Sequence, residues 1–177
     1  MIYPLLDKLH LIPEHFQPGR PLGPPNEIVL HITEGTTASG AIASSEQSVK
    51  PKRKSFHFII DRDGTVTQCV DTDNVAWHAS EANMRSVGIE HVSLSQPGAD
   101  ALNEAHPGQH FVALPATDAQ YAASAKLIAW ICRAHSIPCD RTHILTHNQS
   151  SPLDGHVLCC TGGLDPDRVV SMAAVIV

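Results

Sequence analysis

The chain has 177 residues, a formal charge of −6 and a hydrophobic content of 42%. This length suits one domain with its own hydrophobic core and is too short for two of ordinary size. The 12 basic residues are spread along an acidic chain, which argues against nucleic acid as a partner, and no apolar run approaches the roughly 18 residues of a membrane span.

Residues 1–26 contain six prolines and little apolar periodicity. This composition predicts an extended arm that lies over the rest of the protein, and residues 27–177 are expected to form the single folded domain. The start of the chain has no basic region followed by an apolar core. We therefore expect a protein that is made in the cytoplasm without a secretory signal.

Three elements are expected in the first half of this domain. Residues 27–33 are a short run rich in branched apolar residues, which predicts a buried strand with His31 near its carboxyl end. Residues 36–48 have the spacing of a short helix, and the basic run KPKRK that follows is expected to be a solvated turn. Residues 55–60 and 65–70 predict the strands of a hairpin, because an Asp-Gly pair between them supplies the turn.

The second half is expected to continue the alternation of strands and helices. A Gly-, Pro- and His-rich stretch at 95–115 predicts a long functional loop, and residues 146–164 predict a second loop without apolar periodicity. The elements around these loops are a strand at 86–94, a long helix that starts at 117, a strand at 142–145 and a final helix from 165 to about 173. Strands interspersed with helices predict an α/β domain with a central mixed β-sheet flanked by helices.

Metal-binding side chains occur at three positions far apart in the sequence. His31 ends the first predicted strand, His147 follows the strand at 142–145, and Cys159-Cys160 come soon after. Imidazole nitrogen and thiolate sulfur suit Zn²⁺, and three protein ligands with one open position are typical of a catalytic zinc site. No compact CxxC or HExxH motif is present, so the spacing alone leaves ordinary buried residues as the alternative.

Six segments extend this pattern, in the order IVLHITEG, KSFHFIIDRDGTVTQ, NVAWHAS, NMRSVGIE, LTHNQSSP and CCTGGLDPDRV. Together they resemble the zinc-dependent N-acetylmuramoyl-L-alanine amidases, the amidase-2 family that includes phage lysozyme-type amidases and the peptidoglycan recognition proteins. The resemblance covers residues 27–170. It implies a catalytic domain with one Zn²⁺ per chain that hydrolyses the amide between N-acetylmuramic acid and L-alanine in peptidoglycan.

The resemblance also implies a set of metal ligands. His31 and His147 match the two histidine ligands of the family. Cys160 matches the third ligand better than Cys159, because Gly162 then stays in register with a family glycine, although the family usually has Pro where Thr161 stands.

A second implied set of residues surrounds the metal. Glu90 matches the carboxylate base of the peptidoglycan-recycling branch of the family, whereas Phe56 stands where the phage and animal branch has a Tyr. Zinc lowers the pKa of its bound water to about 7, so a neighbouring carboxylate can accept the proton. Leu158 replaces a family Lys that stabilises the oxyanion, which leaves this task to His156 or to the metal alone.

Trp77, His78 and Asn83 match residues that line the substrate groove of the family. We expect all three to contact the substrate or to orient a metal ligand, and not to bind the metal themselves. His57, on the predicted hairpin, is expected to be structural.

Two rival functions fit parts of the sequence. A non-catalytic peptidoglycan-binding module of the same fold would keep the groove without the chemistry, and a zinc or redox sensor would use Cys159-Cys160. For Cys132 and Cys139, a disulfide and two ordinary buried thiols both stay open.

The biological setting has three alternatives. The protein would recycle wall fragments in the cytoplasm, act as a phage endolysin, or be a secreted antibacterial effector that has an immunity or inhibitor protein as its partner. The long 95–115 stretch and the proline-rich arm favour attack on the intact wall, which an exported or released protein would reach in the periplasm.

Overall fold

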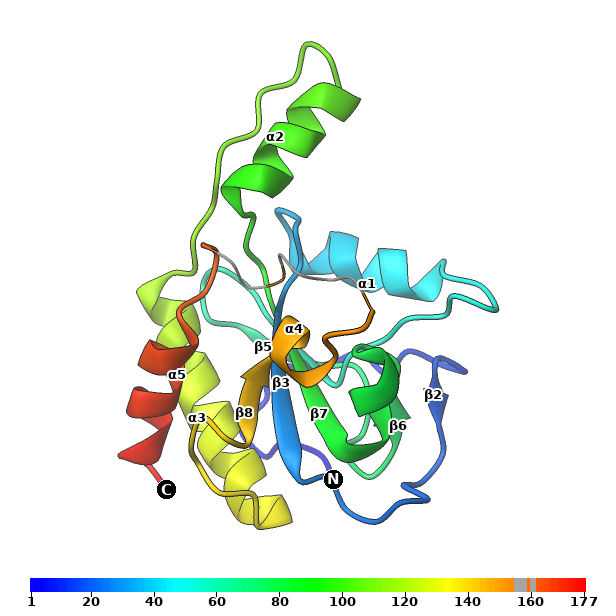
Figure 1. The fold of residues 1–177 in the computed structure, drawn as a ribbon, viewed down its shortest axis with the longest axis vertical. Helices are drawn as coiled ribbons and strands as arrows, with labels where there is room; N and C mark the ends of the chain where they lie inside the picture. The colour runs from blue at the N-terminus through cyan, green and yellow to red at the C-terminus, as the bar shows by residue number, and fades with distance from the viewer. Residues whose placement is uncertain (155–158, 160–161) are drawn as a thin grey trace.

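The computed structural model describes residues 1–154, 159 and 162–177, which fold into a six-stranded sheet with helices against it (Figure 1). The strand order is β1-β5-β4-β7-β3-β8. These strands are β1 (Lys8–Leu9), β3 (Glu27–Ile32), β4 (Phe58–Ile60), β5 (Val66–Gln68), β7 (Ser86–His91) and β8 (Ile144–Thr146). A second, two-stranded sheet consists of β2 (Phe16–Gln17) and β6 (Val75–Ala76). The helices are α1 (Ala38–Glu46), the 3-10 helix η1 (Ser80–Arg85), α2 (Gln96–Ala105), α3 (Asp118–His135), α4 (His147–Ser150) and α5 (Pro166–Ala174).

The sheet is mixed, as the alternation of strands and helices predicts. β3 pairs in parallel with both β7 and β8, and β4 pairs in parallel with β7. β4 and β5 form the predicted antiparallel hairpin, in which Gly64 adopts a φ of 88° that residues with a Cβ rarely adopt. Because β3, β7 and β8 are parallel, their carboxyl ends lie at one edge of the sheet, which is where α/β proteins bind their ligands.

Side chains of the central strand β3 alternate between the two faces of the sheet. Ile28, Leu30 and Ile32 belong to the main hydrophobic core together with side chains of α3 and α5. These two helices pack against each other and cover that face (Figure 1). The intervening side chains of β3, including His31, therefore point to the opposite face.

The opposite face collects polar groups from β7 as well. Val87 and Ile89 enter the main core, so Ser86, Gly88 and Glu90 lie on the same face as His31. The parallel register pairs His31 with Glu90. Alternation thus brings two of the predicted site residues together near the carboxyl ends of neighbouring strands.

The longest helix, α3, begins and packs as the sequence predicts. Thr117 accepts a hydrogen bond from the Gln120 amide, and the Gln120 side chain accepts one from the Thr117 amide, which forms a capping box. The predicted apolar stripe is buried, namely Tyr121, Ala125, Ile128, Ala129 and Cys132. In the part of the chain that the structure describes, no helix has both the length and the hydropathy for crossing a membrane.

The N-terminal arm is extended and completes the domain. β1 adds a parallel strand beside β5. Tyr3 is buried in the main core, and Ile12 is buried in a smaller cluster that includes residues of α1. Arg20 donates hydrogen bonds to three main-chain carbonyl oxygens, those of Thr72, Met84 and Ser86. Residues 1–26 therefore lie over the domain and share its core.

The prediction of two long loops is wrong in part. Residues 95–115 contain α2, which Ser95 caps and which has Pro97 in its first turn, where a helix needs no N–H. Residues 146–164 begin with α4, whose start also has a capping box, formed by Thr146 and Gln149. Ser, Thr, Pro and Gly are common at helix starts as well as in loops, so composition does not separate the two.

Candidate metal centre and active site

Three side chains converge at the carboxyl ends of the parallel strands. His31 comes from β3, His147 is the first residue of α4 directly after β8, and Cys159 lies between α4 and α5. Their candidate ligand atoms all lie within 4.8 Å of one another, the one such group of His, Cys and acidic side chains among the described residues. His31 Nδ1 is 3.1 Å from His147 Nδ1 and 3.8 Å from Cys159 Sγ.

This donor set fits a zinc ion. Ligand atoms at about 2.0–2.3 Å from a tetrahedral metal lie roughly 3.3–3.8 Å from one another, close to the distances from His31 Nδ1. The Asp154 carboxylate is 2.5 Å from His147 Nε2 and holds a proton there, which directs Nδ1 of that ring toward His31. Two imidazole nitrogens that face each other at 3.1 Å need a proton or a metal ion between them.

The electrostatics of His147 agree with a cation at this position. Burial lowers the pKa of the His147 imidazole, but its bonds with Cys159 and Asp154 outweigh burial and raise the pKa above its usual value. A proton therefore occupies the site readily when no metal does. Binding of a metal ion would displace that proton.

Two predicted site residues lie outside the described residues. These are Cys160, the predicted third ligand, and His156, the predicted partner of the oxyanion. Within the described part of the chain, the thiol that lies beside the two histidines is that of Cys159. Cys159 thus becomes a candidate ligand in its own right, and the choice of Cys160 stays a prediction.

Glu90 lies beside His31 across the β3–β7 pair. Burial raises the pKa of its carboxyl to about 7, although the nearby His31 opposes this rise. The Glu90 Oε2 atom is buried and has no hydrogen-bond partner among the residues that the structure describes. A carboxyl group with a pKa near neutrality, next to a metal-binding cluster, is suited to accept and return a proton.

The hairpin strand offers no competing base. Phe56, where the resemblance leads one to expect a Tyr in the phage and animal branch, is buried in a hydrophobic cluster. His57 is fully buried, and its Nδ1 accepts a hydrogen bond from the Gly88 amide while its Nε2 lies 3.1 Å from the Asn74 carbonyl oxygen. Burial and the charge of Arg20 lower the pKa of His57 to about 3. The ring is therefore neutral and structural, as predicted.

The His78 ring lies against the His31 ring. Its Nδ1 is 3.0 Å from His31 Nε2, and its Nε2 is 3.2 Å from Ser86 Oγ. Burial, together with the neighbouring His31 and His57, lowers the pKa of His78 well below its usual value. Of the two roles predicted for His78, orientation of a metal ligand matches these contacts, and contact with the substrate stays a prediction.

Residues 21–163 match the Amidase_2 family, which is described as N-acetylmuramoyl-L-alanine amidase. The chain belongs to this family. The resemblance carried by the six sequence segments is therefore confirmed, and with it the activity of an N-acetylmuramoyl-L-alanine amidase on peptidoglycan. A comparison with curated proteins finds no match.

Solved structures share the fold of this amidase. A selenomethionine derivative of AmpD is 20% identical over 96% of each chain, with a TM-score of 0.73. The N-acetylmuramoyl-L-alanine amidase LysC from Clostridium intestinale URNW is 19% identical over 93% of this chain and 95% of its own, with a TM-score of 0.65. The Ph2119 endolysin from Thermus scotoductus MAT2119 bacteriophage Ph2119 is 19% identical over 85% of this chain and 86% of its own, with a TM-score of 0.60. These similarities confirm the predicted α/β fold.

Two of the three predicted substrate residues of the amidase line a hollow of ≈ 290 Å³. Trp77 and Asn83 form it together with Lys50, Pro51 and Arg53. Asn83 Oδ1 also accepts hydrogen bonds from the main-chain amides of residues 78 and 79, so its carbonyl shapes the turn. An indole beside two cations suits a ligand that has both an apolar face and carboxylates. The basic run is largely exposed, as its sequence predicts, and its residues Lys50, Pro51 and Arg53 also line this hollow.

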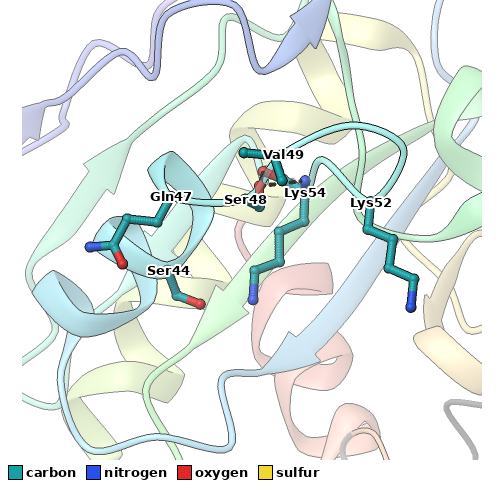
Figure 2. A pocket seen from close by; sticks show the side chains of 6 residues that line it. All are labelled: Ser44, Gln47, Ser48, Val49, Lys52 and Lys54. Carbon is teal, nitrogen blue, oxygen red and sulfur yellow. Dashed lines mark hydrogen bonds between the residues drawn. The ribbon is translucent and has the colours of Figure 1, made fainter.

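A larger hollow, of ≈ 500 Å³, lies on the other side of the basic run. It is lined by residues from the end of α1 and the segment after it, namely Ser44, Gln47, Ser48, Val49, Lys52 and Lys54 (Figure 2). The side chains of Lys52 and Lys54 extend in the same direction in Figure 2. None of the candidate metal ligands lines this hollow.

The structure adds residues that the sequence did not indicate. Asp154 contacts His147 directly, and Ser86 contacts His78, which in turn contacts His31. A carboxylate seven residues after a histidine ligand, in an irregular segment, has no periodicity that would reveal it. Ser86 does have a signal, because it shares a sheet face with Glu90 by alternation along β7.

Proposed function

We propose that this amidase cleaves wall peptidoglycan with one Zn²⁺ held by His31, His147 and a thiolate of the Cys159-Cys160 pair, and with Glu90 as the base. The observation that carries the proposal is the carboxyl of half-buried Glu90, whose Oε2 atom is buried, beside a three-ligand cluster. A binding module without catalysis has no use for such a carboxyl. A thiol-based sensor has no use for the two converging histidines.

Glu90 moves one proton in this reaction. When bound, zinc acts as a Lewis acid toward the lactyl carbonyl and makes water more acidic. Glu90 accepts a proton from the attacking water as its oxygen bonds to the carbonyl carbon. It returns this proton to the nitrogen of L-alanine when the C–N bond breaks. The second proton of the water then leaves the lactyl carboxyl group for solvent, so the products are a lactyl carboxylate and a free stem peptide.

A cation is also needed where the carbonyl oxygen gains negative charge. We propose His156 for this task, as a protonated imidazole that donates a hydrogen bond. Lys54 is a second candidate, because its charge acts on the Glu90 carboxyl and its side chain is exposed. Lys50 and Arg53, beside Trp77, are proposed to bind carboxylates of the stem peptide.

The proposed substrate is the intact wall, which the protein reaches by release through a membrane lesion or by secretion. α2 and the residues after it project from the body of the domain (Figure 1). Ser93 Oγ lies 2.7 Å from the Leu114 carbonyl oxygen and 3.1 Å from that of Gly163, so the base of this projection is tied to the segment that follows Cys159. A projection anchored beside the site would extend contact with a polymer and is not needed for a small fragment.

Removal of the projection is expected to change the rate of hydrolysis for the intact wall and not for small muropeptides. Leu94 and Leu114 pair in antiparallel fashion, so an Asn-Gly turn can replace residues 95–113. We expect the shortened protein to hydrolyse soluble muropeptides like the parent and to release stem peptide from sacculi about 10-fold more slowly, which corresponds to about 1.4 kcal/mol. Equal rates on sacculi would instead favour the recycling role, and an equal loss on both substrates would show that the projection supports the site itself.

The function as a whole is tested by metal removal. Purified protein is incubated with sacculi and with isolated muropeptides, with and without a chelator, and products are identified by mass spectrometry. We expect free stem peptide, no product after chelation, and recovery with Zn²⁺ because the ligands stay in place. Failure to release stem peptide, or release that chelation does not change, would contradict the proposal.

A further inference from the structure

We infer that Ser86 and His78 fix the tautomer of His31, so that His31 binds the metal through Nδ1. This inference rests on the proposed metal site and gives two residues outside that site a positioning role. It follows from a chain of four hydrogen-bonding groups that ends at a main-chain carbonyl.

The donor and acceptor at each of these hydrogen bonds are determined by the carbonyl group of Ala82. Ser86 Oγ lies 2.7 Å from the carbonyl oxygen of Ala82, which can only accept, so the Ser86 hydroxyl donates its one proton there. Ser86 Oγ must then accept from His78, whose Nε2 is 3.2 Å away. The Nε2 of His78 therefore carries the proton of that neutral ring, and its Nδ1 presents a lone pair.

The protonation of His78 in turn determines which nitrogen of His31 carries a proton. The lone pair of His78 Nδ1 faces His31 Nε2 at 3.0 Å, so His31 Nε2 must carry a proton and donate it. His31 Nδ1 is then left with its lone pair, directed at His147 Nδ1 and Cys159 Sγ. Asp154 does the same for His147 from the other side of the cluster. Both imidazoles are thus held as metal ligands before a metal binds.

Gly88 provides the space for this arrangement. A Cβ on Gly88 would lie 2.5 Å from Cγ and 2.6 Å from Nδ1 of the His78 ring, so no side chain is accommodated there. Ser86, on the same face of β7, is fully buried. Strand β7 therefore leaves room for the His78 ring at Gly88 and, two residues away, places the Ser86 hydroxyl that orients this ring.

The test compares two serine hydroxyls in similar surroundings. Ser86→Ala removes the group that orients His78, while Ser124→Ala removes a hydroxyl that lies 2.9 Å from His91 Nε2. Both serines are fully buried. The His91 ring, however, lies 3.0 Å from the main-chain carbonyl oxygen of His31, whereas the His78 ring lies 3.0 Å from the His31 ring itself. The two variants should therefore lose similar stability and differ in their effect on the His31 ring.

Zinc affinity is measured by competition with a chromophoric chelator. We expect Ser86→Ala to bind zinc about 10-fold more weakly than the parent and Ser124→Ala to bind it like the parent. His78→Asn, which keeps an acceptor near the position of Nδ1, should retain more affinity than His78→Leu. Equal affinities for Ser86→Ala and Ser124→Ala, at equal stability, would overturn the inference.

A spectroscopic measurement separates this inference from the proposed reaction. Long-range ¹H–¹⁵N NMR of the metal-free protein reports which nitrogen of His31 carries the proton. We expect protonation at Nε2 in the parent and in Ser124→Ala, and a mixture of tautomers in Ser86→Ala. A parent protein with His31 protonated only at Nδ1 would refute the inference even if it cleaved peptidoglycan, and the Nε2 tautomer would stand even if no cleavage were found.

Discussion

Glu90→Gln is expected to lower kcat by about 10²–10⁴-fold, the usual contribution of a general base, while zinc stays bound. The amide cannot accept a proton from water, but it fills the same space beside His31. Stem-peptide release gives the rate, and metal content after dialysis gives the occupancy. Glu27→Gln is the matched control, since Glu27 is a buried carboxylate on the same strand as His31 that bonds to Arg85 and Ser150. That control should lose stability and keep turnover, and loss of zinc from Glu90→Gln would show that Glu90 is a ligand instead.

The same substitution should stabilise the metal-free protein at high pH. The pKa of Glu90 is raised from 4.5 to about 7 in the folded state, so the folded protein holds this proton more tightly than the unfolded chain. Stability is therefore lost as the pH rises between these values, and the loss above pH 7 approaches about 3 kcal/mol. In urea unfolding with chelator present, Glu90→Gln should gain up to this amount over the parent at about pH 8 and little at about pH 5. A gain that is equal at both pH values would contradict the assigned cause, which is burial of the charged carboxylate.

Alternation along two strands explains why much of the site could be predicted from the sequence. His31 and Glu90 occupy regular strands, and a side chain on a strand has only two directions. The apolar neighbours of each residue enter the main core, which sends His31 and Glu90 to the other face. His147 was predictable for a similar reason, because it follows directly on β8, whose parallel pairing with β3 brings the two histidines to one edge.

The remaining part of the site lies where no periodicity applies. Cys159 and Asp154 belong to the stretch between α4 and α5, in which spacing along the chain does not set the direction of a side chain. The role of Ser86 depends on the direction of three successive hydrogen bonds, which only the folded geometry supplies. The helix α2 was missed because its first turn uses the residues that also mark loops.

The choice between the two adjacent cysteines has a large expected effect on metal binding. Cys159→Ala is expected to weaken zinc binding by more than the about 10–100-fold that loss of an outer partner costs, because it removes a ligand itself. The basis for this expectation is that the Cys159 thiol lies 3.8 Å from His31 Nδ1 and shares a hydrogen bond with His147. Co²⁺ substitution gives a direct readout, since a thiolate ligand produces a charge-transfer band that imidazole and water do not.

Cys160→Ala is the matched variant, because it removes the same group one residue away. If Cys159 is the ligand, the charge-transfer band disappears in Cys159→Ala and persists in Cys160→Ala, whereas the family register predicts the reverse. A weaker band that persists in both variants would indicate that both thiolates bind. That result closes the fourth position and argues against hydrolysis, since structural zinc sites have four protein ligands and catalytic sites keep one position open. The band therefore identifies the third ligand and, independently of any activity assay, tests that the centre is built for catalysis.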